Sequence, residues 1–149
     1  MDQALTISVR YHVAHVLVTV AGEIDITTAP QLRGQLTLLA AGGRPVIADL
    51  TEVTFIDAAG LGVLAAAAGK AAASGGSLHV VSDRYQVRRV FAITGLDRQI
   101  PLARTLAEAM ASLPAGRDIR ANGKQPQPGP PGLARTAGKD TVTGEEVTG

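Results

Sequence analysis

A strand-to-helix transition in the middle of the chain constrains the fold more than any other feature. Residues 45–50 form a short, apolar and β-branched run, which is typical of a strand in the centre of a sheet. Residues 55–64 then read Phe-Ile-Asp-Ala-Ala-Gly-Leu-Gly-Val-Leu and lead into an alanine-rich segment. The pattern predicts a buried strand, a short turn that holds Asp57, and a helix from Gly60 to Ala73.

Strands and helices alternate on either side of this transition. Alternating apolar and polar residues mark an opening hairpin, and apolar residues three or four positions apart mark helices. The expected elements are strands at 5–10 and 13–20, a helix from Thr27 or Thr28 to about Ala41, the strand at 45–50, the helix at 60–73, a strand at 78–81, a helix capped by Ser82 or Asp83 that ends near Gly95, an edge strand at 100–102 and a helix at 105–113. This order predicts an α/β fold with a mixed, mostly parallel sheet of four to five strands, an N-terminal hairpin and about four helices.

The composition changes sharply near Pro114. Residues 114–149 are rich in glycine and proline and contain few large apolar residues, so they cannot bury enough surface to offset chain entropy. We therefore expect a domain over residues 1–113 and a disordered tail over residues 114–149. A segment that docks on a partner is the alternative interpretation of the tail.

Charge and composition exclude several functions. A net charge of +1 provides no general attraction to nucleic acid or to anionic membranes. The absence of cysteine excludes disulfides and thiolate catalysis, and an aromatic content of 3% disfavours the stacking of bases or sugars. No apolar run approaches the ~20 residues that span a bilayer, and no secretory signal is visible. A cytoplasmic protein is expected, without direct contact to nucleic acid or membrane.

Two aspartates lie where a predicted strand gives way to a helix. Asp57 precedes a helix whose free amide groups would lie at Gly60, Leu61 and Gly62, an arrangement that suits an anion or an acidic group of a partner. Asp25 ends the segment Gly-Glu-Ile-Asp in the same kind of position. Either carboxylate can instead simply cap its helix or form a turn, and both interpretations stay open at this point.

The residues alone give little support for an enzyme, a metal centre or a cofactor. Two carboxylates at one sheet edge can bind a metal or transfer protons, but no histidine is close to them in sequence. His12, His15 and His79 fall on predicted strands or on the hairpin. The chain also lacks a phosphate-binding Gly-Lys-Ser/Thr loop and a Gly-x-Ser-x-Gly nucleophile turn.

Three motifs in order resemble the STAS domain of bacterial anti-sigma-factor antagonists. They are residues 22–28, residues 49–62, and the segment from Gly75-Gly76 through residues 87–96. The resemblance covers roughly residues 5–113. It implies a partner-binding surface without catalytic residues or metal, made of Asp25, Thr27, Thr28, Asp57, Ala58, Ala59, Gly60, Leu61 and Gly62.

The resemblance also implies a mechanism. In this family the unmodified domain binds a serine-kinase-like anti-sigma factor and so frees a sigma factor. The kinase then phosphorylates a serine directly after the loop aspartate, and the added charge ejects the antagonist. Here that position is Ala58, which has no hydroxyl. A constitutive antagonist is therefore expected, as a monomer or weak homodimer. Thr51 and Thr54 are the nearest hydroxyls, with Thr54 expected to face the core.

Two other functions remain as alternatives. A scaffold or sensor module would bind a nucleotide or another small ligand at the helix N-terminus, and saturable nucleotide binding without a protein partner would favour it. An enzyme that uses Asp25 and Asp57 would require turnover that disappears on Asp57→Asn.

Overall fold

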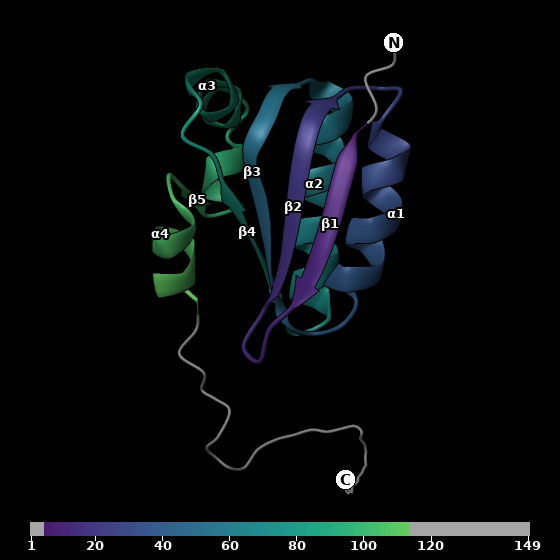
Figure 1. The fold of residues 1–149 in the computed structure, drawn as a ribbon, viewed down its shortest axis with the longest axis vertical. Helices are drawn as coiled ribbons and strands as arrows, with labels where there is room; N and C mark the ends of the chain where they lie inside the picture. The colour runs from purple at the N-terminus through teal and green to yellow at the C-terminus, as the bar shows by residue number, and fades with distance from the viewer. Residues whose placement is uncertain (1–4, 114–149) are drawn as a thin grey trace, which may run out of the picture. The chain divides into compact units, whose positions relative to one another are not determined.

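The computed structural model describes residues 5–113, which form one mixed sheet with helices on both of its faces (Figure 1). The strands are β1 (Thr6–Tyr11), β2 (Val16–Ile24), β3 (Pro45–Ile56), β4 (Ser77–Val81) and β5 (Leu102–Ala103). The helices are α1 (Ala29–Ala40), α2 (Ala58–Ala73), α3 (Tyr85–Thr94), the short 3-10 helix η1 (Leu96–Arg98) and α4 (Leu106–Ala111). The strands lie in the order β1-β2-β3-β4-β5, with β1 antiparallel to β2 and all other pairs parallel. The predicted fold class and hairpin are confirmed.

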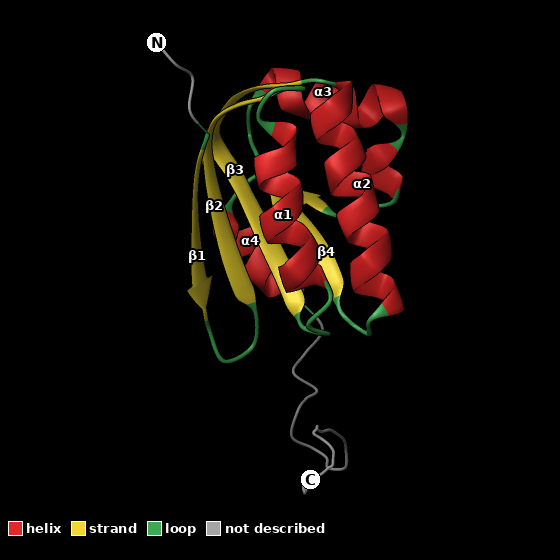
Figure 2. Ribbon diagram, turned by 90° about the vertical axis from the view of Figure 1, so that its right-hand side faces the viewer, coloured by secondary structure: helices red, strands yellow, loops and turns green. Residues whose placement is uncertain are grey.

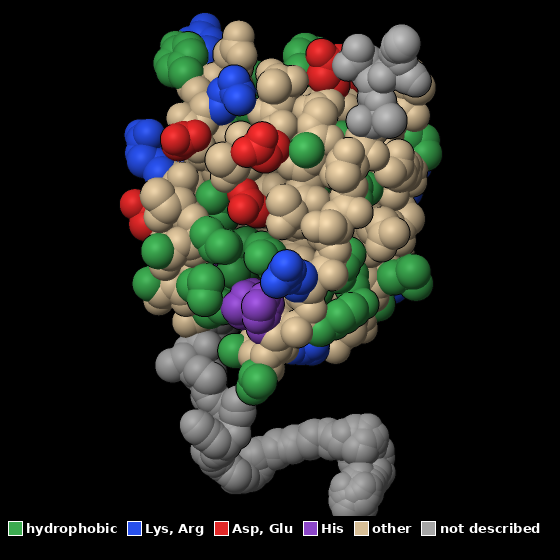
Figure 3. Space-filling model, in the orientation of Figure 1, with side chains coloured by type: hydrophobic (Ala, Val, Ile, Leu, Met, Phe, Trp, Pro, Cys, Tyr) green, Lys and Arg blue, Asp and Glu red, His purple; other side chains and the backbone are tan. Residues whose placement is uncertain are grey.

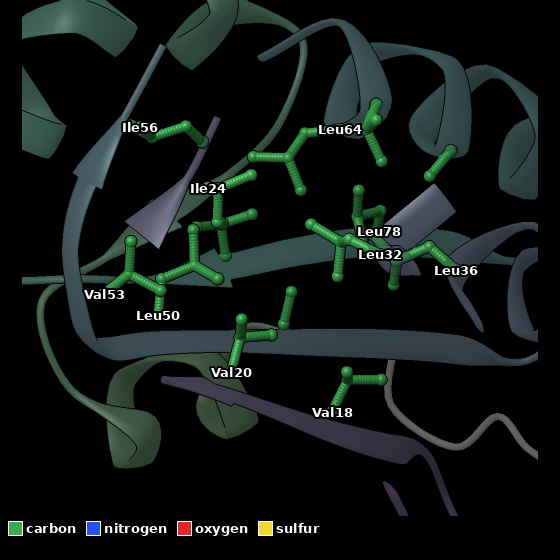
Figure 4. Packing of buried hydrophobic residues seen from close by; sticks show 14 of the residues in the cluster. Val18, Val20, Ile24, Leu32, Leu36, Leu50, Val53, Ile56, Leu64 and Leu78 are labelled. Carbon is green, nitrogen blue, oxygen red and sulfur yellow. The ribbon is translucent and has the colours of Figure 1, made fainter. Parts of the chain in front are cut away.

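The hydrophobic core lies between the sheet and helices α1, α2 and α3. Figure 2 shows these helices in front of the sheet and α4 behind it. On β2, alternate residues point into the core, so Val18 and Val20 are fully buried while Thr19 between them is not. Figure 4 shows these valines facing Leu32 of α1, whose side chain is also fully buried.

Strand β3 is twice as long as the sequence pattern indicates, which corrects the predicted end at residue 50. Beyond Leu50 the strand continues to Ile56, with only Val53 and Ile56 buried in this second half. The apolar pattern stops because β3 pairs with β4 only as far as Asp49 and then pairs with β2 alone. The extension carries the ends of β2 and β3 beyond β4. On the face opposite α1 and α2, acidic side chains gather over the upper part of the sheet (Figure 3).

Two predicted helix starts are wrong. The predicted ends of α1, α2 and α3 are confirmed to within one residue, whereas α4 ends at Ala111 rather than at residue 113. Helix α2 begins at Ala58 rather than Gly60, because the Asp57 side chain caps it two residues earlier. Helix α3 begins after Arg84, so neither Ser82 nor Asp83 is its N-cap residue. The Arg84 backbone amide donates to Ser82 Oγ, which places the serine in the turn before the helix. Gly95 ends α3 with a φ of 77°, a left-handed conformation that favours glycine.

The predicted tail over residues 114–149 lies outside the described residues. Within residues 5–113, every helix is too short or too polar to cross a membrane.

Two buried histidines link stability to pH. His15 and His79 are only 4% and 5% exposed, and within residues 5–113 Nδ1 of each lacks a hydrogen-bond partner. Burial lowers the pKa of His79, and burial followed by the charges of His12 and Arg44 lowers the pKa of His15. In the unfolded chain both return to about 6.5, so the unfolded state binds more protons just below that pH.

The free energy of unfolding is therefore expected to fall as the pH drops below about 6.5, by about 1.4 kcal/mol for each unit by which a folded-state pKa is lowered. Urea denaturation at pH 7.5 and pH 5.5 measures this loss. The double replacement His15→Leu and His79→Leu should remove most of it. An equally large loss in the double variant would show that other groups are responsible.

Candidate partner-binding site

The candidate site consists of two loops that lie side by side at the extended end of the sheet. Ile24 and Ile56 are the last paired residues of β2 and β3. The Asp57 backbone amide donates to the Ile24 carbonyl at 3.1 Å. Asp25 and Asp57 therefore leave the sheet next to each other, at the starts of the β2–α1 and β3–α2 loops. The structure brings together the two aspartates that the sequence placed at one sheet edge.

Asp57 caps helix α2. Its Oδ1 accepts hydrogen bonds from the amides of Ala59 at 2.9 Å and Gly60 at 3.2 Å, and its backbone is extended as an N-cap requires. Both bonds end on Oδ1, so the cap does not use Oδ2. The side chain is only half-buried. Capping and partner contact are therefore compatible roles for this one carboxylate.

Gly60 allows the helix to start directly against the strand ends. A Cβ atom at this position would lie 2.5 Å from Ile24 Cγ2 and 2.7 Å from Ile56 Cγ1, which is far closer than carbon atoms approach. Only glycine permits this contact without moving the isoleucines. Gly60 thus fixes the first turn of α2 above the junction of β2 and β3.

The β2–α1 loop is held by its own aspartate and by one of its two threonines. Asp25 Oδ1 accepts from the amides of Thr27 at 2.9 Å and Thr28 at 3.1 Å. Thr28 Oγ1 donates to the Glu23 carbonyl at 2.8 Å and accepts from the Asp25 amide at 3.0 Å. The Thr28 side chain is buried and supports the loop from within, whereas Thr27 is exposed.

Thr28→Val is therefore expected to lower the free energy of unfolding by about 1–3 kcal/mol, because it leaves a carbonyl and an amide without their shared partner. Thr27→Val is the matched control and should change stability by less than about 0.5 kcal/mol. Thermal or urea denaturation compares the two. Equal stability of the two variants would contradict the assigned role of the Thr28 hydroxyl.

The surface of the first turns of α2, directly after Asp57, is made mostly of small residues. Ala58 and Gly62 are exposed, and Ala59 and Leu61 are half-buried. Ala58 presents a methyl group and no hydroxyl. Thr51 and Thr54 are both exposed, so the expectation that Thr54 faces the core is wrong. Both threonines lie in the part of β3 that continues past its pairing with β4, so one edge of the strand is unpaired there.

Two large apolar side chains beside the aspartates were missed by the sequence interpretation. Ile26 is 77% exposed directly after Asp25, and Phe55 is 47% exposed two residues before Asp57. Both side chains are therefore accessible to a partner. The signal in the sequence was the position of these two large apolar residues, one directly after Asp25 and the other two residues before Asp57.

No group of three or more histidine, cysteine, aspartate or glutamate side chains within residues 5–113 is arranged to hold a metal ion. At the site itself, the Oδ1 atoms of Asp25 and Asp57 are occupied by backbone amides. The arrangement offers carboxylate oxygens, a capped helix N-terminus and an apolar rim, which are the components of a binding surface.

Comparison with known proteins identifies the family. Residues 6–109 match the STAS domain model, and the chain belongs to this family. It is 35% identical over 92 residues to an anti-sigma-B factor antagonist of Bacillus subtilis strain 168, covering 62% of this chain and 84% of the relative. It is 30% identical over 115 residues to the anti-sigma-F factor antagonist RsfB of Mycobacterium tuberculosis strain H37Rv, covering 76% and 93%.

A crystal structure supports the same relationship. An anti-sigma factor antagonist from Mycobacterium paratuberculosis has a TM-score of 0.70 and 34% sequence identity to this chain, covering 79% of this chain and 98% of that protein. The family predicted from the three motifs is confirmed.

Proposed function

We propose that this protein is an anti-sigma-factor antagonist that binds a kinase-like anti-sigma factor and thereby frees a sigma factor. The observation that carries the proposal is the pairing of the two loops after Ile24 and Ile56 in a chain whose relatives are named anti-sigma factor antagonists. The proposed binding module spans residues 1–113. It acts in the cytoplasm by binding rather than by catalysis, without direct contact to nucleic acid.

The geometry of the loops suits a protein partner. The small side chains of Ala58 and Gly62 allow a partner backbone to approach closely. Asp57 Oδ2 is free of the capping role and can accept a hydrogen bond from the partner. Ile26 and Phe55 supply apolar area beside this polar contact. Buried apolar anchors beside a few directed polar contacts are the usual composition of an interface core.

In the proposed mechanism, phosphorylation of the segment around Asp57 does not regulate the complex. A phosphoryl group requires an acceptor hydroxyl, and residues 55–62 contain none. The antagonist would therefore bind its partner constitutively. The cellular level of the antagonist, or another factor, would determine how much anti-sigma factor is bound.

Ala58→Ser tests this regulation. The serine hydroxyl would stand at the exposed first residue of α2, beside Asp57. With ATP and the anti-sigma factor, the variant is expected to gain phosphate at position 58. The modified form should then bind at least about 10-fold more weakly, because about −1.5 to −2 charges enter the interface next to a carboxylate. Wild-type protein treated identically is the control. Phosphorylation of the wild-type domain with release of the partner would contradict constitutive binding.

A further inference from the structure

The two edges of the sheet differ in how they are protected against pairing with another chain. At one edge, β5 is only two residues long and directly follows Pro101, which has no backbone N–H to donate. At the other edge, β1 runs for six residues without proline or glycine and pairs with β2 in an unbroken register. Figure 1 shows β1 as the outermost strand on its side of the sheet. An edge of this kind is a template on which a further strand can pair.

The hairpin turn determines which backbone groups lie along the open edge of β1. The His12 amide donates to the His15 carbonyl at 2.9 Å, so this pair of residues is hydrogen-bonded. Hydrogen-bonded and non-hydrogen-bonded pairs alternate along an antiparallel ladder, so the residues of β1 with even numbers bond to β2. The residues with odd numbers turn their amides and carbonyls away from β2, along the open edge, and they are Ile7, Val9 and Tyr11.

We propose that β1 pairs antiparallel with β1 of a second copy of this chain and joins two five-stranded sheets into one. The twofold axis passes at Val9, so that Val9 faces Val9 of the second copy and Ile7 faces Tyr11. Each of these pairs exchanges two hydrogen bonds through the backbone groups that point away from β2.

One occupied carbonyl and the apolar side chains favour this register. A shift of the second strand by two residues would place Leu5 opposite Tyr11, but the Leu5 carbonyl already accepts a hydrogen bond from Gln31 Nε2 at 3.0 Å. In the proposed register the half-buried Ile7 lies opposite Tyr11, which is 69% exposed. Pairs of an aromatic and a β-branched residue across two strands stabilise a sheet, and the symmetry forms this pair twice.

The other face of β1 is compatible with the same register. Arg10 is the one charged residue of the strand, and it lies opposite Ser8 of the second copy. The two arginines therefore do not face each other across the new pair of strands. A second copy fits this edge because its own apolar and polar residues match in both directions.

The symmetry leaves the candidate site of each copy accessible. Because β2 is antiparallel to β1, the β2 strands of the two copies run in opposite directions. The candidate site follows the end of β2 at Ile24, so the two sites lie at opposite ends of the joined sheet. One dimer is therefore expected to bind two anti-sigma factor chains. This stoichiometry rests on the proposed function, whereas the pairing of β1 does not.

Opposite charges at Ser8 test the register by sedimentation equilibrium of the full chain. Ser8 is exposed, and its neighbour on β2, Thr19, is uncharged. Ser8→Glu places a carboxylate opposite Arg10 of the second copy and should lower the dimer dissociation constant about 5-fold, whereas Ser8→Lys should raise it about 5-fold. Gln86→Glu and Gln86→Lys on the exposed side of α3 are the matched controls and should change it less than about twofold. A monomer at millimolar concentration, or equal effects of both charges at Ser8, would overturn the proposal.

Hydrogen exchange of backbone amides in the wild-type protein supplies an independent readout. The amides of Ile7, Val9 and Tyr11 should become protected as the protein concentration rises, whereas the Ser8 amide, which bonds to β2, should be protected throughout. Exchange at Val9 that does not depend on concentration would overturn the proposal. Protection of Val9 only after an anti-sigma factor is added would also overturn it, because the edge would then bind a strand of that protein. A dimer that binds no anti-sigma factor would support the pairing of β1 and refute the proposed function alone.

Discussion

Asp57→Lys is expected to lower the affinity for the anti-sigma factor at least about 30-fold, equivalent to about 2 kcal/mol of binding free energy. The lysine removes the carboxylate oxygen that the cap leaves free and places a positive charge at the N-terminus of α2, where the helix dipole already disfavours cations. It also removes the cap, which costs about 1 kcal/mol of stability. Isothermal titration of purified proteins measures the change in affinity.

Asp57→Asn separates the capping role from the contact with the partner. Asparagine is as good an N-cap as aspartate, so stability should change by less than about 0.5 kcal/mol. The affinity should still fall about 10-fold because the charge is gone. If Asp57→Asn binds as tightly as wild type, the carboxylate only caps α2, and the contact assigned to it does not exist.

Gly60→Ala is expected to lower the free energy of unfolding by about 1–3 kcal/mol. The added methyl group would fall 2.5 Å from Ile24 Cγ2 and 2.7 Å from Ile56 Cγ1, and both isoleucines sit in a close-packed core. Either the isoleucines move or the first turn of α2 lifts from the sheet. The midpoint of urea denaturation measures the loss, provided that the slope is unchanged.

Gly69→Ala is the matched control for this prediction. It lies in the same helix, meets no atom within 4 Å, and should raise stability by about 0.5–1 kcal/mol through helix propensity alone. Opposite signs for the two glycines would establish that Gly60 is required by packing. Stabilisation by both substitutions would contradict the close contact between α2 and the strand ends.

The topology could be predicted because the helix ends and the central strands have local chemical causes. Paired glycines stop α1 and α2, Gly95 ends α3, and β-branched runs mark the strands that lie in the middle of the sheet. The neighbouring positions of Asp25 and Asp57 followed from the rule that parallel strands end at the same edge. Their roles in binding remain predictions.

The second half of β3 could not be predicted from its residues. Thr51 to Phe55 lack the continuous apolar pattern of the first half, because only Val53 of this segment is buried and only β2 pairs with it. The start of α2 was misplaced because capping by Asp57 depends on a loop geometry that the sequence does not specify.

Affinity capture from native cell extract, followed by mass spectrometry, tests the proposed function most directly. Wild-type protein and the Asp57→Lys variant would be immobilised in equal amounts, with Gly69→Ala as a folded control. The proposal predicts that wild type and the control retain a kinase-like anti-sigma factor and that Asp57→Lys does not. Failure of wild type to retain such a protein, or equal retention by Asp57→Lys, would contradict it. Saturable nucleotide binding by the isolated protein would then favour a small-ligand module.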